Sequence, residues 1–192
     1  MTSPFPVRVV VEGSTGRTVL LCMPDPVPSD PDPETTWARG VTLLTADTTA
    51  SDPTEAADRL AGAILLRGSD LIGVVGWAEG GLTALVLATR HPALVDRLVM
   101  IGTPVPPLAP ELDLITAKTL LLYGAKDPTA GPRDGKWYQQ RLPDRRYEQI
   151  PGEGRLLLGP VWRRTLSHLA PNHRRPATAA GSPPEPPNRA EA

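Results

Sequence analysis

Residues 76–81 read Gly-Trp-Ala-Glu-Gly-Gly and lie between the apolar run 71–75 and the apolar stretch 82–88. This pattern predicts a β-strand that turns sharply through glycines into an α-helix. In a G-x-S-x-G pattern such a turn exposes a serine hydroxyl that attacks a carbonyl carbon. The central residue here is Ala78, and a methyl group cannot act as a nucleophile. The sequence therefore predicts the turn without the group that performs the chemistry.

Three nearby residues carry groups that could replace a serine. Cys22 lies near the end of a predicted strand, Asp25 follows it in a proline-rich turn, and Glu79 adjoins Ala78. Buried thiols and carboxylates can have strongly shifted pKa values and so take part in catalysis. Each residue also has an ordinary structural interpretation, Cys22 as a small apolar strand residue and Glu79 as an acid in the first turn of a helix. The residues alone leave both interpretations open.

Apolar runs that suit strands alternate with amphipathic stretches that suit helices. Strands are predicted over 7–11, 18–21, 41–44, 71–75, 97–101, 119–123 and 146–150, and helices over 54–66, 81–89, 133–141 and 156–169. The segment 13–16, Gly-Ser-Thr-Gly, predicts a hairpin or tight connection between the first two strands. Most strands are continuously apolar rather than alternating, which favours a mainly parallel sheet covered by helices on both faces. The fold class predicted is an α/β sandwich.

Two stretches define finer expectations. In 54–66 the buried face is predicted to consist of Ala57, Leu60, Ala61, Ile64 and Leu65, with Ser51 or Asp52 as the N-terminal signal before Pro53. The connection 103–118 is rich in proline and too short for an inserted lid domain. We therefore predict a sandwich without a lid.

Composition limits the classes of partner. The chain has 192 residues, a formal net charge of −1, one cysteine and three dispersed histidines. This predicts one domain, over 7–170, with no disulfide, no metal site, no cofactor and no nucleic-acid partner. No run approaches the roughly 20 apolar residues that span a bilayer, and the first residues do not resemble a secretory signal. We expect a cytoplasmic protein without a membrane partner. The segment 171–192, rich in proline and alanine, is predicted to be a disordered tail.

Three stretches resemble the α/β-hydrolase superfamily, and together the resemblance covers roughly 18–170. LIGVVGWAEGGLTALVLATRHPALVDRLVMIGTP resembles the strand, turn, helix and next strand around that family's nucleophile. TLLLYGAKDP resembles the strand and loop that carry the family's catalytic acid. RYEQIPGEGRLLL resembles the strand and loop that carry its catalytic histidine. The resemblance places the nucleophile, acid and histidine positions on Ala78, Asp127 and Arg155. A guanidinium, with a pKa above about 12, cannot serve as a base at neutral pH.

The resemblance also suggests the oxyanion donors. One backbone N–H comes from the residue after the nucleophile, here Glu79, and the other from the loop near Met23 and Pro24. Pro24 has no N–H to donate. Because the loops of acid and histidine meet in the family, Asp127 and Arg155 are predicted to form an ion pair.

We therefore predict a non-catalytic binding or interaction module for a small acyl or carboxylate ligand, or for a protein partner. Arg155 is the predicted anchor, with Met23, Trp77 and Glu79 beside it. Two alternatives remain open. One is an unconventional hydrolase or lyase that uses Asp127, Glu79 or Cys22, or that is completed by a partner chain. The other is a purely structural subunit.

Overall fold

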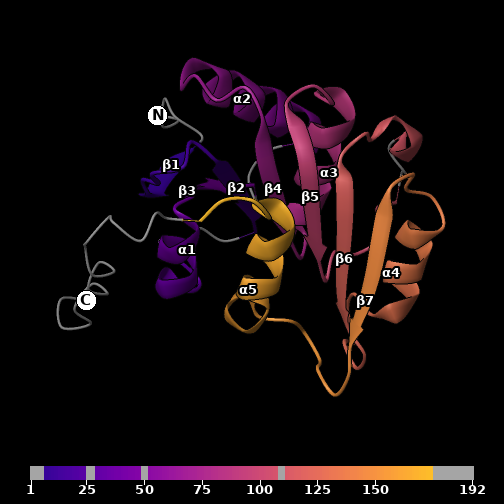
Figure 1. Ribbon diagram of the computed structural model, residues 1–192. Helices are drawn as coiled ribbons and strands as arrows, with labels where there is room; N and C mark the ends of the chain where they lie inside the picture. The colour runs from indigo at the N-terminus through magenta and orange to yellow at the C-terminus, as the bar shows by residue number, and fades with distance from the viewer. Residues whose placement is uncertain (1–6, 25–28, 49–51, 108–110, 175–192) are drawn as a thin grey trace.

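The computed structural model describes residues 7–24, 29–48, 52–107 and 111–174. Its centre is a seven-stranded sheet in the order β1-β3-β2-β4-β5-β6-β7 (Figure 1). The strands are β1 (Arg8–Val11), β2 (Thr18–Met23), β3 (Thr42–Asp47), β4 (Ile72–Trp77), β5 (Val95–Ile101), β6 (Lys118–Gly124) and β7 (Arg145–Ile150). β1 pairs antiparallel with β3 and every other pair is parallel. The prediction of a mainly parallel sheet is therefore confirmed. The carboxyl ends of β2 to β7 therefore share one edge, where open α/β sheets bind ligands.

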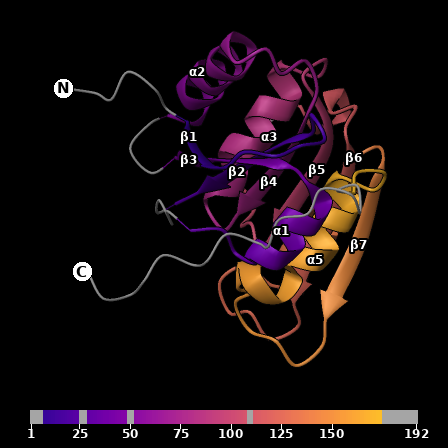
Figure 2. The ribbon, with the colours of Figure 1, turned by 60° about the vertical axis from the view of Figure 1, so that its left-hand side comes forward.

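Five α-helices of the described ranges cover the sheet. They are α1 (Pro33–Arg39), α2 (Pro53–Leu66), α3 (Gly80–Arg90), α4 (Pro132–Gln139) and α5 (Leu158–Leu169). In Figure 2, α1 and α5 lie on one side of the sheet, and α2 and α3 lie on the other. None of the helices in the described part of the chain is long and apolar enough to cross a membrane.

Alternate residues of each central strand enter two separate cores. In β2, Leu20 and Cys22 join the core beneath α2, α3 and α4, while Val19, Leu21 and Met23 join the core beneath α5. Strands buried on both faces need apolar side chains at every position, which explains their continuous apolar character. Burial of this kind contributes about 25 cal/mol for each Å² of apolar surface removed from water.

Of the two alternatives predicted for 13–16, a hairpin or a tight connection, the hairpin is wrong. β1 and β2 do not pair with each other, because β3 lies between them in the sheet. The connecting segment instead docks on the end of α1: the N–H groups of Ser14 and Thr15 both donate to Gly40 O, at 2.9 and 3.0 Å. Those bonds satisfy backbone donors that a hairpin would have paired across two strands.

Helix α1 was not predicted. It has seven residues and lacks apolar periodicity, so only its ends carried a signal. Asp32 accepts a hydrogen bond from Thr35 N at 3.1 Å, Pro33 follows it, and Gly40 ends the helix at φ 59°. These are a side-chain N-cap and a left-handed C-terminal residue. Burial of the helix comes through Thr36, whose Oγ1 accepts from Trp162 Nε1 at 2.8 Å.

Helix α2 begins where the sequence predicts, and its buried face differs from the predicted one at a single residue. Asp52 is the N-cap and accepts from the N–H groups of Thr54 and Glu55. Ala57, Leu60, Ala61 and Ile64 are buried, but Leu65 is 57% exposed. Leu65 follows Ile64 by one residue and so points about 100° away from the sheet.

The connection from β5 to β6 holds only a short 3-10 turn, Leu112–Leu114, in its described part. This agrees with a sandwich without a lid. Residues 108–110 of the connection lie outside the described residues, as does the predicted tail from 175 onward. Residues 171–174 follow α5 directly, and His173 N donates to Ala170 O at 3.3 Å.

Candidate functional site

Ala78 forms the turn between β4 and α3 at the carboxyl edge of the sheet. Its φ is +50°, and it is the one non-glycine residue with a positive φ in the described part of the chain. Its N–H donates to Ile101 O at 2.9 Å, and its carbonyl accepts from Gly81 N at 3.1 Å. A left-handed conformation costs an L-residue about 1–2 kcal/mol. The fold therefore holds Ala78 in a strained turn that presents its side chain beside the start of α3.

Glycines at three positions make this turn possible. A Cβ at Gly76 would meet the backbone of Gly81, and one at Gly80 would meet the carbonyl of Cys22. A Cβ at Gly81 would meet the side chain of Thr103, which follows β5. The absence of side chains lets α3 start within contact distance of β2, β4 and the end of β5.

The first turn of α3 offers unbonded donors. Within the described residues, the N–H groups of Glu79 and Gly80 donate to no acceptor, while Gly81 N and Leu82 N bond back to Ala78 O and Glu79 O. Glu79 occupies the N-cap position but makes no capping hydrogen bond. Free N–H groups at a helix N-terminus favour negatively charged or electron-rich groups.

Met23 borders this turn through its backbone only. Its side chain is 1% exposed and packs in the core beneath α5. Its carbonyl accepts from both N and Oγ1 of Thr48, at 3.1 and 2.9 Å. The backbone of Cys22 and Met23 lies against Gly80, so β2 approaches the turn where the second oxyanion donor was predicted. Asp25 lies outside the described residues.

Asp127 lies in the loop after β6 and is 8% exposed. Its Oδ1 accepts from the N–H groups of Thr129 and Ala130, at 2.8 and 3.1 Å. Its Oδ2 lies 3.6 Å from the position that a Cβ on Gly102 would occupy. Gly102 follows Ile101, which binds Ala78 N. The carboxylate thus lies at the same sheet edge as the strained turn, between the ends of β5 and β6.

Arg155 does not pair with Asp127, so the predicted ion pair is wrong. Its guanidinium lies over the ring of Trp77, 5.1 Å from the centroid, and Nη2 lies 3.9 Å from Glu79 Oε2. Trp77 Nε1 in turn donates to Leu156 O at 2.8 Å. The ring offers a long cationic side chain an apolar, electron-rich face, which sequence patterns do not reveal.

The loops of Asp127 and Arg155 nevertheless touch. Lys126 N donates to Glu153 O at 2.8 Å, and a Cβ on Gly124 would overlap Gly154 O. Residues within three positions of each site residue are therefore in contact, although the Arg155 side chain turns toward Trp77. The structure brings together Trp77, Ala78, Glu79 and Arg155, with Asp127 after β6, which β5 separates from β4.

The remaining candidate groups lie elsewhere or are inert. Cys22 is fully buried, and this burial raises the pKa of its thiol to about 12. His91 Nε2 lies 2.9 Å from Asp58 Oδ1, and His168 Nε2 lies 2.8 Å from Lys118 O. Neither histidine approaches Asp127. Among the described residues no group of His, Cys, Asp and Glu side chains could hold a metal ion.

Sequence reasoning missed two neighbours of the site. Gly102, at φ 52°, lies against the Asp127 carboxylate. Thr103 is fully buried against Gly81, and its Oγ1 has no hydrogen-bond partner. Its carbonyl accepts from Tyr123 Oη at 2.8 Å. A Gly-Thr-Pro sequence after a buried strand was the available signal, but its partners come from other strands.

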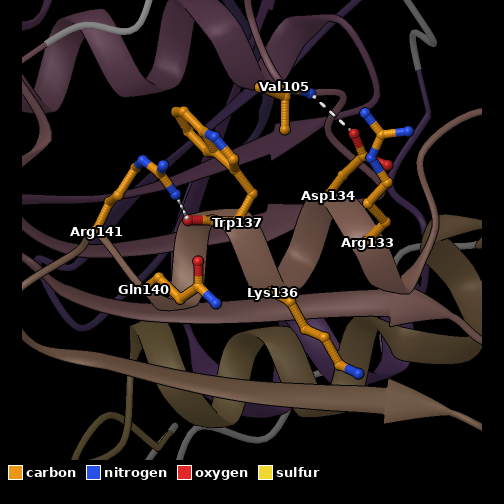
Figure 3. Close-up of a pocket in the computed structure, with 7 residues that line it drawn as sticks. All are labelled: Val105, Arg133, Asp134, Lys136, Trp137, Gln140 and Arg141. Carbon is orange, nitrogen blue, oxygen red and sulfur yellow. Dashed lines mark hydrogen bonds between the residues drawn. The ribbon is translucent and has the colours of Figure 1, made fainter.

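A groove of about 580 Å³ lies along α4 (Figure 3). It is lined by Val105, Arg133, Asp134, Lys136, Trp137, Gln140 and Arg141. In it the Arg141 guanidinium lies 4.2 Å from the centre of the Trp137 ring. None of its lining residues belongs to the strained turn or to the loops of Asp127 and Arg155.

Comparison with known proteins gives one short sequence match. No protein-family model matches the chain. A stretch of 30 residues, 16% of the chain, is 67% identical to a pimeloyl-[acyl-carrier protein] methyl ester esterase from Aromatoleum aromaticum. This match spans 12% of that esterase.

Solved structures match over most of the chain. A predicted CIB-like hydrolase from Thermoplasma acidophilum has a TM-score of 0.66 and 21% identity, covering 82% of this chain and 84% of that one. An alpha/beta hydrolase fold protein from Nakamurella multipartita has a TM-score of 0.66 and 16% identity, covering 85% and 99%. A malate-bound thermophilic esterase from Thermogutta terrifontis has a TM-score of 0.65 and 16% identity, covering 84% and 90%. With its parallel sheet, its two helical layers and its glycine-lined turn after β4, the protein has the α/β-hydrolase fold.

Proposed function

We propose that the protein is a non-catalytic binding module that holds a small carboxylate or acyl ligand at the strained turn. The observation that carries this proposal is Ala78, a methyl group at φ +50° where this fold presents a nucleophile. In a serine hydrolase, removal of the nucleophile alone lowers kcat by about a million-fold. The residual rate comes from binding and from oxyanion donors.

Arg155 supports the choice of ligand. Its side chain is 54% exposed, and its contact with Glu79 at 3.9 Å is an exposed pair worth about 0–1 kcal/mol. A ligand carboxylate can therefore displace Glu79 at small cost and form the bidentate hydrogen bonds that guanidinium favours. The Thermogutta terrifontis esterase was solved with malate bound, so a protein of this fold can hold a small carboxylate.

The alternative is an unconventional ester or acyl hydrolase, or a lyase. The match to an esterase over 30 residues favours this alternative. Against Cys22 as its nucleophile stand full burial and the pKa of about 12, because a protonated thiol is a poor nucleophile. Asp127 and Glu79 remain as carboxylates for such a mechanism, with or without a partner chain.

Hydrolysis of p-nitrophenyl acetate and butyrate tests the absence of catalysis. The variants are Ala78→Ser, Arg155→His and the double variant, beside the natural protein. We expect the natural protein to be inert and the double variant to gain turnover, since Asp127 is already present. Turnover by the natural protein that is unchanged in Ala78→Ser and lost in Asp127→Asn would refute the proposal and favour the carboxylate enzyme.

Calorimetric titration with acetate, butyrate and malate tests the binding. We expect Arg155→Ala to weaken carboxylate binding by about tenfold or more, because a charge-assisted hydrogen bond contributes about 1.5–3 kcal/mol. Arg133→Ala, an exposed arginine on α4, is the matched control and should bind as the natural protein does. If Arg155→Ala binds acetate, butyrate and malate as tightly as the natural protein does, Arg155 does not bind the carboxylate.

A further inference from the structure

Asp127 is a buried carboxylate without a cation. It is 8% exposed, and the described part of the chain places no Lys, Arg or His nitrogen within 4.0 Å of its oxygens. Two backbone N–H groups bind Oδ1, but no described donor binds Oδ2. Burial of a charge is costly unless it is paired and hydrogen-bonded. Oδ2 is not among the fully buried atoms without a partner, so a donor from outside the described protein can reach it.

The arginine of the adjoining loop contacts other groups. Arg155 lies in the loop that touches the Asp127 loop through the bond from Lys126 N to Glu153 O, but its guanidinium stacks on Trp77 and faces Glu79. The site thus presents an accepting group on Asp127 and, separately, a donating group on Arg155. A ligand that satisfies both has a positive end and a negative end.

We propose that the ligand is a small amino carboxylate, with its ammonium group on Asp127 Oδ2 and its carboxylate on Arg155. This inference rests on the proposed function, because it assumes that Arg155 binds a carboxylate. Charge supports the choice. Asp127 and Glu79 are both acidic and Arg155 is the one basic side chain among these three, so a plain carboxylate would add to a negative site. A zwitterion adds no net charge and gives each protein group an opposite partner.

The exposed neighbours do not reverse this balance. Lys126 and Glu153 border the two loops, carry opposite charges and are both exposed. Their side chains lie in high-dielectric surroundings, where charge interactions are strongly reduced. Asp127 is 8% exposed as a residue, so its charge is screened less than those of these two side chains and dominates the recognition of the ammonium end.

Matched ligand pairs separate the contribution of the amine from that of the acid. The natural protein is titrated calorimetrically with glycine, β-alanine and γ-aminobutyrate, and with acetate, propionate and butyrate as their counterparts without an amine. We expect at least one amino carboxylate to bind about tenfold more tightly than its counterpart, which corresponds to one charge-assisted hydrogen bond. The chain length of the best ligand reports the separation of the two groups.

Asp127→Asn isolates the acceptor. The amide oxygen can still accept from Thr129 N and Ala130 N, so the loop keeps its hydrogen bonds. We expect this variant to lose the tenfold preference, because the ammonium contact is lost while removal of a negative charge favours the plain acids. Glu153→Gln removes an exposed carboxylate in the adjoining loop and should keep the preference. Thermal melts of both variants check that they fold.

The outcomes distinguish the two proposals. If the plain acids bind and no amino carboxylate exceeds its counterpart, the amino carboxylate inference is wrong while the proposed binding function stands. If Asp127→Asn keeps the full preference, the ammonium does not lie on Asp127 and the inference is equally wrong. If neither series binds, the carboxylate-binding function itself fails and this inference fails with it.

Discussion

Replacement of Ala78 by glycine tests the strained turn directly. At φ +50° an alanine carries about 1–2 kcal/mol of strain that glycine does not. Two losses oppose this relief. The methyl group is 5% exposed, and its burial contributes about 0.8 kcal/mol; the added freedom of glycine in the unfolded chain costs about 0.5–1 kcal/mol. The terms nearly cancel, so we expect the free energy of unfolding to change by less than about 1 kcal/mol.

Ala84→Gly is the matched control in the same helix. Ala84 is fully buried in the interior of α3 and does not have a positive φ. Its replacement costs about 1 kcal/mol in helix propensity and about 0.8 kcal/mol in methyl burial, with no strain to recover. We therefore expect Ala84→Gly to destabilise the protein by about 2 kcal/mol, clearly more than Ala78→Gly.

Thermal and urea unfolding of both variants measure the difference. For a domain of this size, 2 kcal/mol corresponds to about 4–8 °C in Tm. Similar losses in Tm for Ala78→Gly and Ala84→Gly would show that Ala78 carries no left-handed strain. In that case the turn would not hold residue 78 in the strained conformation in which this fold presents a nucleophile.

Three further predictions follow from buried and paired groups. Arg17 is 6% exposed and donates to Asp96 Oδ1 at 2.6 Å. Asp96→Ala leaves this buried cation without its carboxylate partner. We expect urea titrations to show a free energy of unfolding lower by about 1–3 kcal/mol. Cys22, with its pKa of about 12, should resist alkylation by iodoacetamide at pH 8 in the folded protein and react readily in urea. Hydrogen bonds from Arg90, and then from His91, lower the pKa of Asp58 to about 2. The pKa of Asp58 in the folded protein lies below the usual 3.8, so this stabilisation is present above about pH 4 and is lost toward pH 2. The urea midpoint of the natural protein should therefore fall between pH 4 and pH 2. Asp58→Asn should reduce that fall.

Controls for these predictions come from exposed groups. Glu12 pairs with Arg67 at 3.0 Å on the surface, so Glu12→Ala should change stability by no more than about 1 kcal/mol. Asp70 is exposed and takes part in no ion pair of the described chain. Asp70→Asn should therefore not change the fall of the urea midpoint between pH 4 and pH 2. If Asp70→Asn reduces the fall of the urea midpoint as much as Asp58→Asn does, the contacts of Asp58 are not the cause of that fall.

Much of the fold could be predicted because its strands are buried on both faces. Runs such as 71–75 and 119–123 have one explanation in a small chain, a central strand in a parallel sheet. The position of β1 could not be predicted in this way, because its pairing with β3 is a long-range choice that local patterns do not encode. The same holds for α1, which is too short to show a helical period.

The candidate site was predictable in its backbone and less so in its side chains. The glycines around Ala78 indicated the sharp turn, and the resemblance placed Asp127 at the same sheet edge. The direction of Arg155 was predicted wrongly. A long flexible side chain chooses among several partners, and the face of Trp77 competed with the carboxylate of Asp127. That choice depends on rotamers and burial, which sequence spacing does not determine.

The stacking of Arg155 on Trp77 has a spectroscopic consequence. The indole ring is anchored at Leu156 O through its Nε1, while its face carries the guanidinium. A molecule that draws the guanidinium away changes the electric field across a fixed chromophore. Of the four tryptophans in the chain, Trp37, Trp137 and Trp162 lie on α1, α4 and α5, and Trp77 is the one whose ring carries the Arg155 guanidinium. The protein therefore contains an intrinsic fluorophore at the place where we expect its ligand, and occupancy can be followed without a label.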